Sequence, residues 1–164
     1  MKETKTRKPT KLTIMIGLNI YKAPPLLLEQ VDNICRLLWQ GKQEYELVAT
    51  SISDKDLRRT MLSLAQESNQ YACELSSQIQ TLGGNPVIQK PGNTDPEDEI
   101  KNLHGENEIV VFCQKNERQM IIAYREILND SFLYEELRKM IRYQLNQMLC
   151  AFMRVKQIGC LKFH

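Results

Sequence analysis

The sequence predicts an all-α fold, an antiparallel four-helix bundle with one long crossover between its second and third helices. Four long segments repeat apolar residues at steps of three and four, the spacing of a helix that is buried along one face. No segment of similar length alternates with the period of a β-strand. A connection rich in proline and glycine separates the second segment from the third. With 164 residues, the chain has the size of one domain.

The first two predicted helices form a hairpin. The first helix begins after Pro24 and Pro25, and the second begins near Asp54, a residue type suited to the N-cap, and ends before Gly83 and Gly84. We call the residues at steps of three and four the seam of a helix. The first seam is Leu27, Val31, Ile34, Leu38, Gly41, Tyr45, Val48 and Ile52, and the second includes Leu57, Met61, Leu64, Ser68, Tyr71 and Leu75.

The third and fourth predicted helices form a second hairpin, which turns at residues 129–131. The third seam is Val110, Cys113, Glu117, Met120, Tyr124 and Ile127. The fourth seam is Leu137, Ile141, Gln144, Met148, Ala151, Val155 and Ile158. Both seams are apolar except at Glu117 and Gln144, which therefore stand out as polar residues at core positions.

The connection at residues 85–105 decides the predicted topology. A helix of about 25 residues is about 38 Å long, and an extended connection of this length can run the whole bundle. The third helix is then expected to start at the far end, which is the topology of ferritin-like bundles. An up-down-up-down bundle with a loose middle loop is the alternative. The bundle is assigned to residues 26–160, and residues 1–25 form an N-terminal arm that docks or is flexible.

Charge is concentrated at the start of the chain. The first eleven residues hold five Lys and Arg against one Glu, whereas the whole chain holds 22 against 20. The body is therefore slightly acidic, and no nucleic-acid partner is expected. Residues 12–20 are apolar but too few to span a bilayer, and no small-x-small cleavage motif follows them. No transmembrane segment is predicted, and export through a weak N-terminal signal is the alternative to a cytoplasmic location.

Five cysteines occur without Cys-x-x-Cys spacing. Cys35, Cys73, Cys113 and Cys150 fall one per predicted helix, where a reduced thiol packs as a small apolar side chain. An odd number of scattered cysteines favours a reduced, cytoplasmic protein.

Four short features stand in order along the helices. They are Gly41 with Tyr45, Glu74-Leu75 with Gly83-Gly84 and Pro86, Glu117 with Tyr124, and Gln144 with Arg154-Val155. Over residues 30 to 158 the chain resembles a bacterial family of ferritin-like proteins described only as a domain of unknown function. The resemblance implies a ferritin-like fold and, loosely, a stress-related or envelope-associated role. The chain has Gln40 where the family often has Asp, and Phe152-Met153 where it often has His-Asp.

A polar core cluster is predicted between the third and fourth helices. Folding the second hairpin about residues 130 and 131 sets Glu117 opposite Gln144, whose amide can donate to a carboxyl group. Hydroxyl groups from Tyr45 and Tyr124 are further donors. The predicted cluster is therefore Glu117, Gln144, Tyr45 and Tyr124.

Metal binding is the alternative use of the same residues. A di-iron carboxylate bundle takes a Glu from each of two helices and a Glu-x-x-His from each of the others. Here Gln70 follows Glu67 at the histidine spacing, and both histidines lie outside the predicted helices. The expectation is no cofactor, and the alternative is iron or manganese held by Glu117, Gln144, Glu67 and Glu44.

These observations favour a protein that is not an enzyme. No Ser-His-Asp or Cys-His set and no phosphate-binding glycine loop is present. The predicted function is self-association into a homo-oligomer, through one bundle face and the arm, or binding of an unknown protein partner. A metal-binding or redox ferritin-like protein with a degenerate carboxylate site is the alternative.

Overall fold

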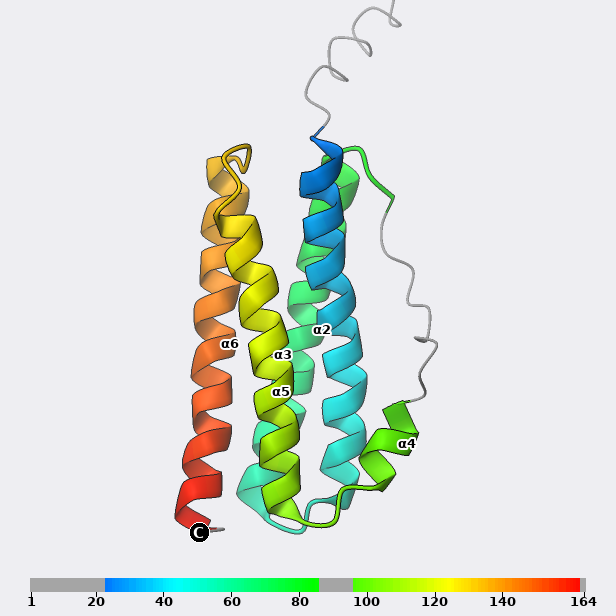
Figure 1. Cartoon of the computed structure of the whole chain (residues 1–164), viewed down its shortest axis with the longest axis vertical. Coiled ribbons are helices and arrows are strands. Elements are labelled where there is room, and N and C mark those ends of the chain that lie inside the picture. Colours follow the sequence, from blue (N-terminus) through cyan, green and yellow to red (C-terminus); the bar gives the residue numbers. More distant parts are fainter. Residues whose placement is uncertain (1–22, 86–95, 163–164) are drawn as a thin grey trace, which may run out of the picture.

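The computed structural model describes residues 23–85 and 96–162. Its helices are α2 (Pro25–Ser51), α3 (Lys55–Thr81), α4 (Pro96–Lys101), α5 (Glu106–Leu128) and α6 (Glu135–Lys162), as Figure 1 shows. No strand occurs within these ranges, so the predicted all-α class is confirmed. The short helix α4 was not predicted. The N-terminal arm lies outside the described residues except at its last positions, where α2 begins.

The order of the helices in space confirms the single long crossover. The helices α2 and α3 are antiparallel, and α5 starts at the same end of the bundle as α3 (Figure 1). The chain must therefore return along the whole bundle between α3 and α5, which excludes the up-down-up-down alternative. The short helix α4 packs against α2 near the end where α5 begins.

The ends of α3 form as the sequence predicts. The side chain of Asp54 accepts a hydrogen bond from the backbone N–H of Leu57 at 2.9 Å, which satisfies one of the free donors of the first turn. At the other end, Gly83 has a φ of 83°, a left-handed conformation that glycine adopts without steric cost. The backbone N–H of Gly84 donates to the carbonyl of Ile79 at 2.9 Å and closes the last turn.

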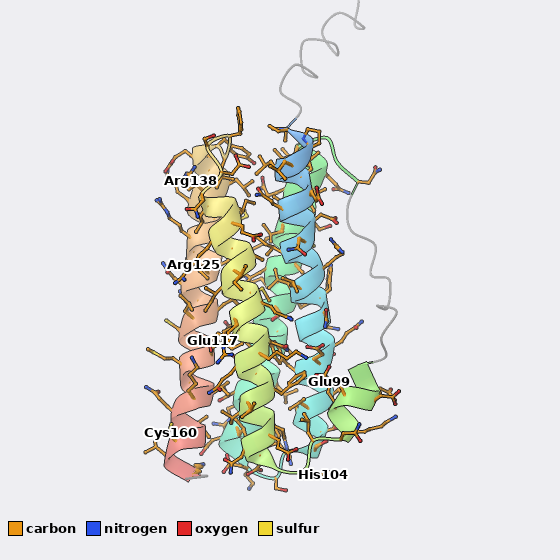
Figure 2. All side chains as sticks on the ribbon, viewed as in Figure 1. Glu99, His104, Glu117, Arg125, Arg138 and Cys160 are labelled. Carbon is orange, nitrogen blue, oxygen red and sulfur yellow. The ribbon has the colours of Figure 1, made fainter. Side chains whose placement is uncertain are left out.

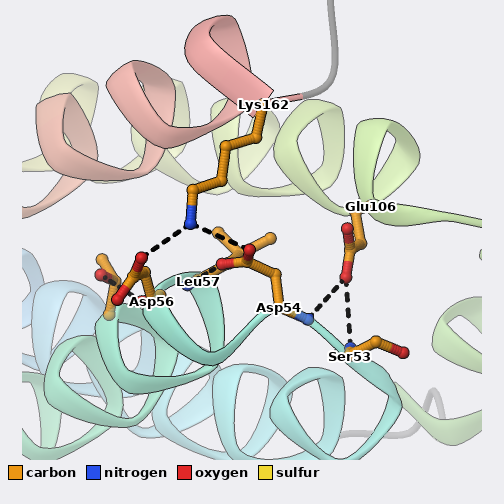
Figure 3. A network of polar contacts seen from close by, with 7 residues as sticks. Ser53, Asp54, Asp56, Leu57, Glu106 and Lys162 are labelled. Atoms are coloured by element: carbon orange, nitrogen blue, oxygen red, sulfur yellow. Dashed lines mark hydrogen bonds and ion pairs between the residues drawn. The ribbon is translucent and has the colours of Figure 1, made fainter.

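A polar network ties three helix ends together at one end of the bundle (Figure 3). The Lys162 ammonium, at the end of α6, contacts Asp54 at 3.0 Å and Asp56 at 2.7 Å. The Glu106 carboxylate, at the start of α5, accepts the backbone N–H groups of Ser53 at 3.2 Å and Asp54 at 3.0 Å. The turn between α2 and α3 is thereby joined to both helices of the second hairpin.

The four seams meet in one continuous core. Within it, the rings of Tyr45 and Phe152 pack edge to face with centroids 6.4 Å apart. Gly41 makes room for this arrangement, because a Cβ atom there would lie 3.1 Å from the Tyr45 ring. The aromatic residues of the seams therefore act as core side chains.

Candidate functional site

Four carboxylates lie at or near the core of the bundle, and each contacts at least one partner side chain of its own. Glu44 comes from α2, Glu67 and Glu74 from α3, and Glu117 from α5. A metal centre would require such carboxylates to converge on shared ions. Their individual contacts decide whether they do.

Glu117 forms an ion pair with Lys156 of α6. The carboxylate lies midway along α5 (Figure 2), and the residue is only 8% exposed. Its two oxygens lie 2.6 and 2.8 Å from the Lys156 ammonium. One cation therefore compensates this carboxylate directly.

Glu44 is more buried than the sequence indicates. The residue flanks the first seam, which suggests a boundary position, but it is 4% exposed. Burial raises the pKa of its carboxyl group, and hydrogen bonds from Gln40 and Asn116, each 2.7 Å long, oppose that rise. The Asn116 amide belongs to α5, so α5 covers Glu44 from across the bundle. The spacing of residues within α2 gives no sign of this contact, which is why the burial was not predicted.

The two carboxylates of α3 face α6. Glu67 is half-buried and lies 3.7 Å from Arg154, with Ser63 donating at 3.4 Å. Gln70 does not support Glu67, because its amide donates to Glu74 at 3.0 Å. The Glu-x-x-Gln spacing therefore forms no common site.

Gln144 is fully buried and bridges α5 and α3. Its amide oxygen accepts the hydroxyl hydrogen of Tyr124 at 3.0 Å, and its amide nitrogen donates to Glu74 at 2.8 Å. Burial raises the pKa of Tyr124 well above its ordinary value, which keeps the hydroxyl protonated as a donor. The predicted pairing of Gln144 with Glu117 is wrong.

The error lies in the register of the second hairpin. The midpoint of the Tyr124–Gln144 pair is residue 134, and the residue opposite Glu117 is then Ala151. The connection is longer than expected because α5 ends at Leu128 and α6 begins only at Glu135. Arg138 holds that connection by donating to the carbonyl of Leu128 at 2.6 Å.

Two clusters therefore replace the predicted one. Tyr124 and Gln144 lie together, but Glu117 is seven residues earlier on α5, about 10 Å along the helix. Tyr45 lies near Asn116 and Glu44, and burial raises the pKa of Tyr45 well above its ordinary value. The Tyr45 hydroxyl has no hydrogen-bond partner. The nearby Asn116 amide opposes part of the rise in the pKa of Tyr45.

The residues do not fit a di-iron centre. The cavity beside Glu44, Tyr45 and Asn116 has a volume of about 10 Å³, the space of one water molecule. Among residues 23–85 and 96–162, no three His, Cys, Asp or Glu side chains gather as metal ligands. His104 is the one histidine of these ranges, and it lies between α4 and α5 rather than in a long helix (Figure 2).

The cysteines divide into two groups. Cys35 and Cys113 are buried as predicted, and desolvation raises the pKa of Cys35 to about 11 and that of Cys113 to about 12. Cys73 and Cys150 are exposed, which corrects the prediction that they pack in the core. They occupy the outer surfaces of α3 and α6.

These outer surfaces carry a pattern that was not predicted from the sequence. Between residues 60 and 81, α3 has only Glu67 and Glu74 as charged residues, and neither is fully exposed. From residue 143 to 161, α6 carries two charged residues: Arg154, which is exposed, and Lys156, which is partly exposed and pairs with Glu117. A second seam of exposed residues runs along α6 at steps of three and four: Tyr143, Asn146, Cys150, Met153, Gln157 and Leu161. That spacing was a detectable signal, because core and outer seams share one period.

The outer surfaces of the other two long helices, α2 and α5, are charged. They carry exposed charges throughout: Glu29, Arg36 and Glu46 on α2, and Glu108, Lys115, Arg118, Arg125 and Glu126 on α5. One side of the bundle is therefore nearly free of exposed charge. We call the outer surfaces of residues 60–81 and 143–161 the α3/α6 face.

Comparison with known proteins agrees with a ferritin-like fold. A solved structure described as a dodecameric thioferritin, the bacterioferritin-related protein from Bacteroides fragilis, superposes with a TM-score of 0.70. It is 16% identical, and the match covers 88% of this chain and 90% of that one. The ferritin-like fold that the sequence predicts is therefore confirmed. No protein-family model and no curated protein matches the chain.

None of the helices within residues 23–85 and 96–162 is long and apolar enough to cross a bilayer.

Proposed function

We propose that the protein is a self-associating ferritin-like bundle whose copies meet through the α3/α6 face. The observation that carries the proposal is the near absence of exposed charge on this face. Interfaces between protein copies are depleted of charged residues at their centres and enriched in aromatic residues and methionine. Tyr143 and Met153 are 58% and 56% exposed in the single chain, and Leu161 is 85% exposed.

The spacing of the exposed residues supports pairing of helices. A seam at steps of three and four lets a helix pack along its length against another helix. The seam of α6 continues from Tyr143 to Leu161, and the adjacent surface of α3 adds the uncharged Gln66, Gln70, Cys73 and Ser77. The fold neighbour is described as a dodecamer, which is in keeping with assembly of the same fold.

The carboxylates support an assembly role without metal chemistry. Lys156 compensates Glu117, amides hold Glu44 and Glu74, and Arg154 lies beside Glu67. The buried rings of Tyr45 and Phe152 fill core space between α2 and α6. No reaction is assigned to these groups, and the five free cysteines fit a reducing cytoplasm.

The test places one negative charge on each of two surfaces. Met153→Glu changes the α3/α6 face, and Ile122→Glu on α5 is the matched control, because the two residues are 56% and 58% exposed. Light scattering should give wild-type protein and the control a mass above the single-chain 19.1 kDa, and Met153→Glu a lower mass. A wild-type monomer, or an equal effect of both variants, would refute the proposal.

Thiol accessibility gives a second readout. If the α3/α6 face is covered, alkylation of Cys150 should slow as the concentration of wild-type protein rises, and should not slow in Met153→Glu. A rate for Cys150 that is independent of concentration in wild-type protein would contradict the proposed interface.

A further inference from the structure

A second surface lies between α4 and the first turns of α5. It is a groove of about 430 Å³. Leu103, Val111 and Phe112 supply apolar lining, and Val111 is 64% exposed. Glu99, Glu108 and Lys115 also line the groove. A groove that is apolar inside and charged around it is suited to a peptide segment with apolar side chains.

The charges around this groove are mainly acidic. Of the residues that line it, Glu99 and Glu108 are acidic and Lys115 is basic. The segment from 96 to 115, which forms the groove, holds five acidic residues and two basic ones, Lys101 and Lys115. Each lysine pairs with a carboxylate, Lys101 with Glu97 and Lys115 with Glu99, each at 2.7 Å, which leaves three carboxylates in excess. The surroundings therefore attract a segment that carries positive charge.

The first twenty residues of the chain have the complementary pattern. Residues 1–11 hold five Lys and Arg against one Glu. Residues 12–20 then alternate with a period of two, in which Leu12, Ile14, Ile16, Leu18 and Ile20 occupy every second position. An extended peptide with this period presents one apolar edge, and the basic residues directly precede it.

The reach of the chain favours a groove on another copy. The described chain begins at Ala23, at the end of α2 that lies away from α4 (Figure 1). Lys115 lies at the level of Glu44, because its neighbour Asn116 donates to Glu44 at 2.7 Å, and Glu99 pairs with Lys115 at 2.7 Å. Glu44 is 21 residues after Ala23, about 30 Å along α2. Ile16, seven residues before Ala23, reaches at most about 25 Å.

We propose that residues 12–20 of one copy occupy the α4/α5 groove of a second copy. The apolar edge covers Leu103, Val111 and Phe112, and the basic residues 2–11 lie against the acidic surroundings. The inference rests on the proposed self-association but uses a surface distinct from the α3/α6 face. Each copy would then contact one neighbour through the α3/α6 face and another through the arm and the α4/α5 groove.

Photo-crosslinking of the full-length chain tests the contact. A copy of natural isotope content carries benzoylphenylalanine at position 16 and is mixed with a tenfold excess of ¹⁵N-labelled wild-type chain. Trypsin cuts after Lys101 and Lys115, so the groove is released as one peptide, residues 102–115. The expected product joins the unlabelled residue 16 to the labelled peptide 102–115. Attachment to the unlabelled peptide 102–115 alone, or to other peptides, would overturn the proposal.

Two labelled variants show whether the groove is the cause, with the yield of cross-linked chains read on a denaturing gel before digestion. Val111→Lys, at an exposed position of the groove, should reduce the cross-link at least tenfold, and Ile122→Lys on the same helix should leave it unchanged. Equal yields for the two variants would also overturn the proposal.

Repeating the experiment with Met153→Glu in both copies separates the two surfaces. If the mass falls but the cross-link is retained, the arm contact persists when the α3/α6 face is disrupted. Loss of the cross-link in Met153→Glu refutes an arm contact that forms independently of that face.

Discussion

Replacing Gln144 by leucine should destabilise the bundle, because Gln144 is the acceptor for a fully buried tyrosine hydroxyl. The change leaves Tyr124 without a partner and removes one donor from Glu74. An unsatisfied buried polar group costs about 1 to 3 kcal/mol. Glu74 loses less, because it is partly exposed and keeps the hydrogen bond from Gln70. The expected loss is about 2 kcal/mol, or about 4 to 8 °C in Tm for a chain of this size.

A double-mutant cycle isolates the contribution of the tyrosine hydroxyl. Adding Tyr124→Phe to Gln144→Leu removes the unsatisfied group, so the double variant should be more stable than Gln144→Leu alone. Urea unfolding followed by circular dichroism measures all four proteins at one protein concentration, because association shifts apparent stability. If Gln144→Leu lies within about 0.5 kcal/mol of wild type, as exposed substitutions do, the buried contact is refuted.

Three further predictions concern two other polar contacts and the accessibility of the cysteines. Lys156→Met should lower Tm by leaving the buried carboxylate of Glu117 uncompensated, and adding Glu117→Gln should restore part of the loss; no recovery in the double variant would argue against the ion pair. The pKa of Asp54 is lowered by its hydrogen bond with the Leu57 backbone and by Lys162, so its stabilisation is present above its unfolded pKa and is lost as pH falls through the folded pKa. Asp54→Ala should therefore lower Tm at pH 7 more than Asp54→Asn, which keeps a capping side chain, and the gap to wild type should close under acid conditions; a gap that is constant with pH contradicts this. In Met153→Glu, a thiol reagent at pH 8 should modify Cys73, Cys150 and Cys160 rapidly and the buried Cys35 and Cys113 only after unfolding, and five equally fast thiols would contradict the placement of the core.

The placement of the helices could be predicted from local features of the chain. Asp54 as an N-cap and Gly83 in a left-handed conformation act within one or two turns, so their effect is visible in the sequence. The length of the connection favoured the crossover, because only a long connection can return along the bundle, but the direction of α5 in the structure was needed to exclude the up-down-up-down alternative. The helix α4 was missed because a segment of six residues is too short to show a helical repeat of apolar residues.

The pairing of polar side chains required the tertiary structure. Seams with a seven-residue repeat fit equally well when one helix slides by seven residues, so periodicity placed Gln144 opposite Glu117 as readily as Ala151. The connection at residues 129–134 decides between these registers. Burial of Glu44 likewise depends on Asn116, which lies 72 residues away.

The sequence by itself determined the four long helices, their order along the chain and the apolar side of each, because these follow from spacing and from contacts within a few residues. Only the tertiary structure decided which carboxylate meets which partner and which surfaces remain uncovered. Lys156 reaches Glu117 across 39 positions, and Cys150 is exposed although it lies beside a core seam. Such contacts depend on the register and rotation of neighbouring helices, which a repeating pattern leaves undetermined.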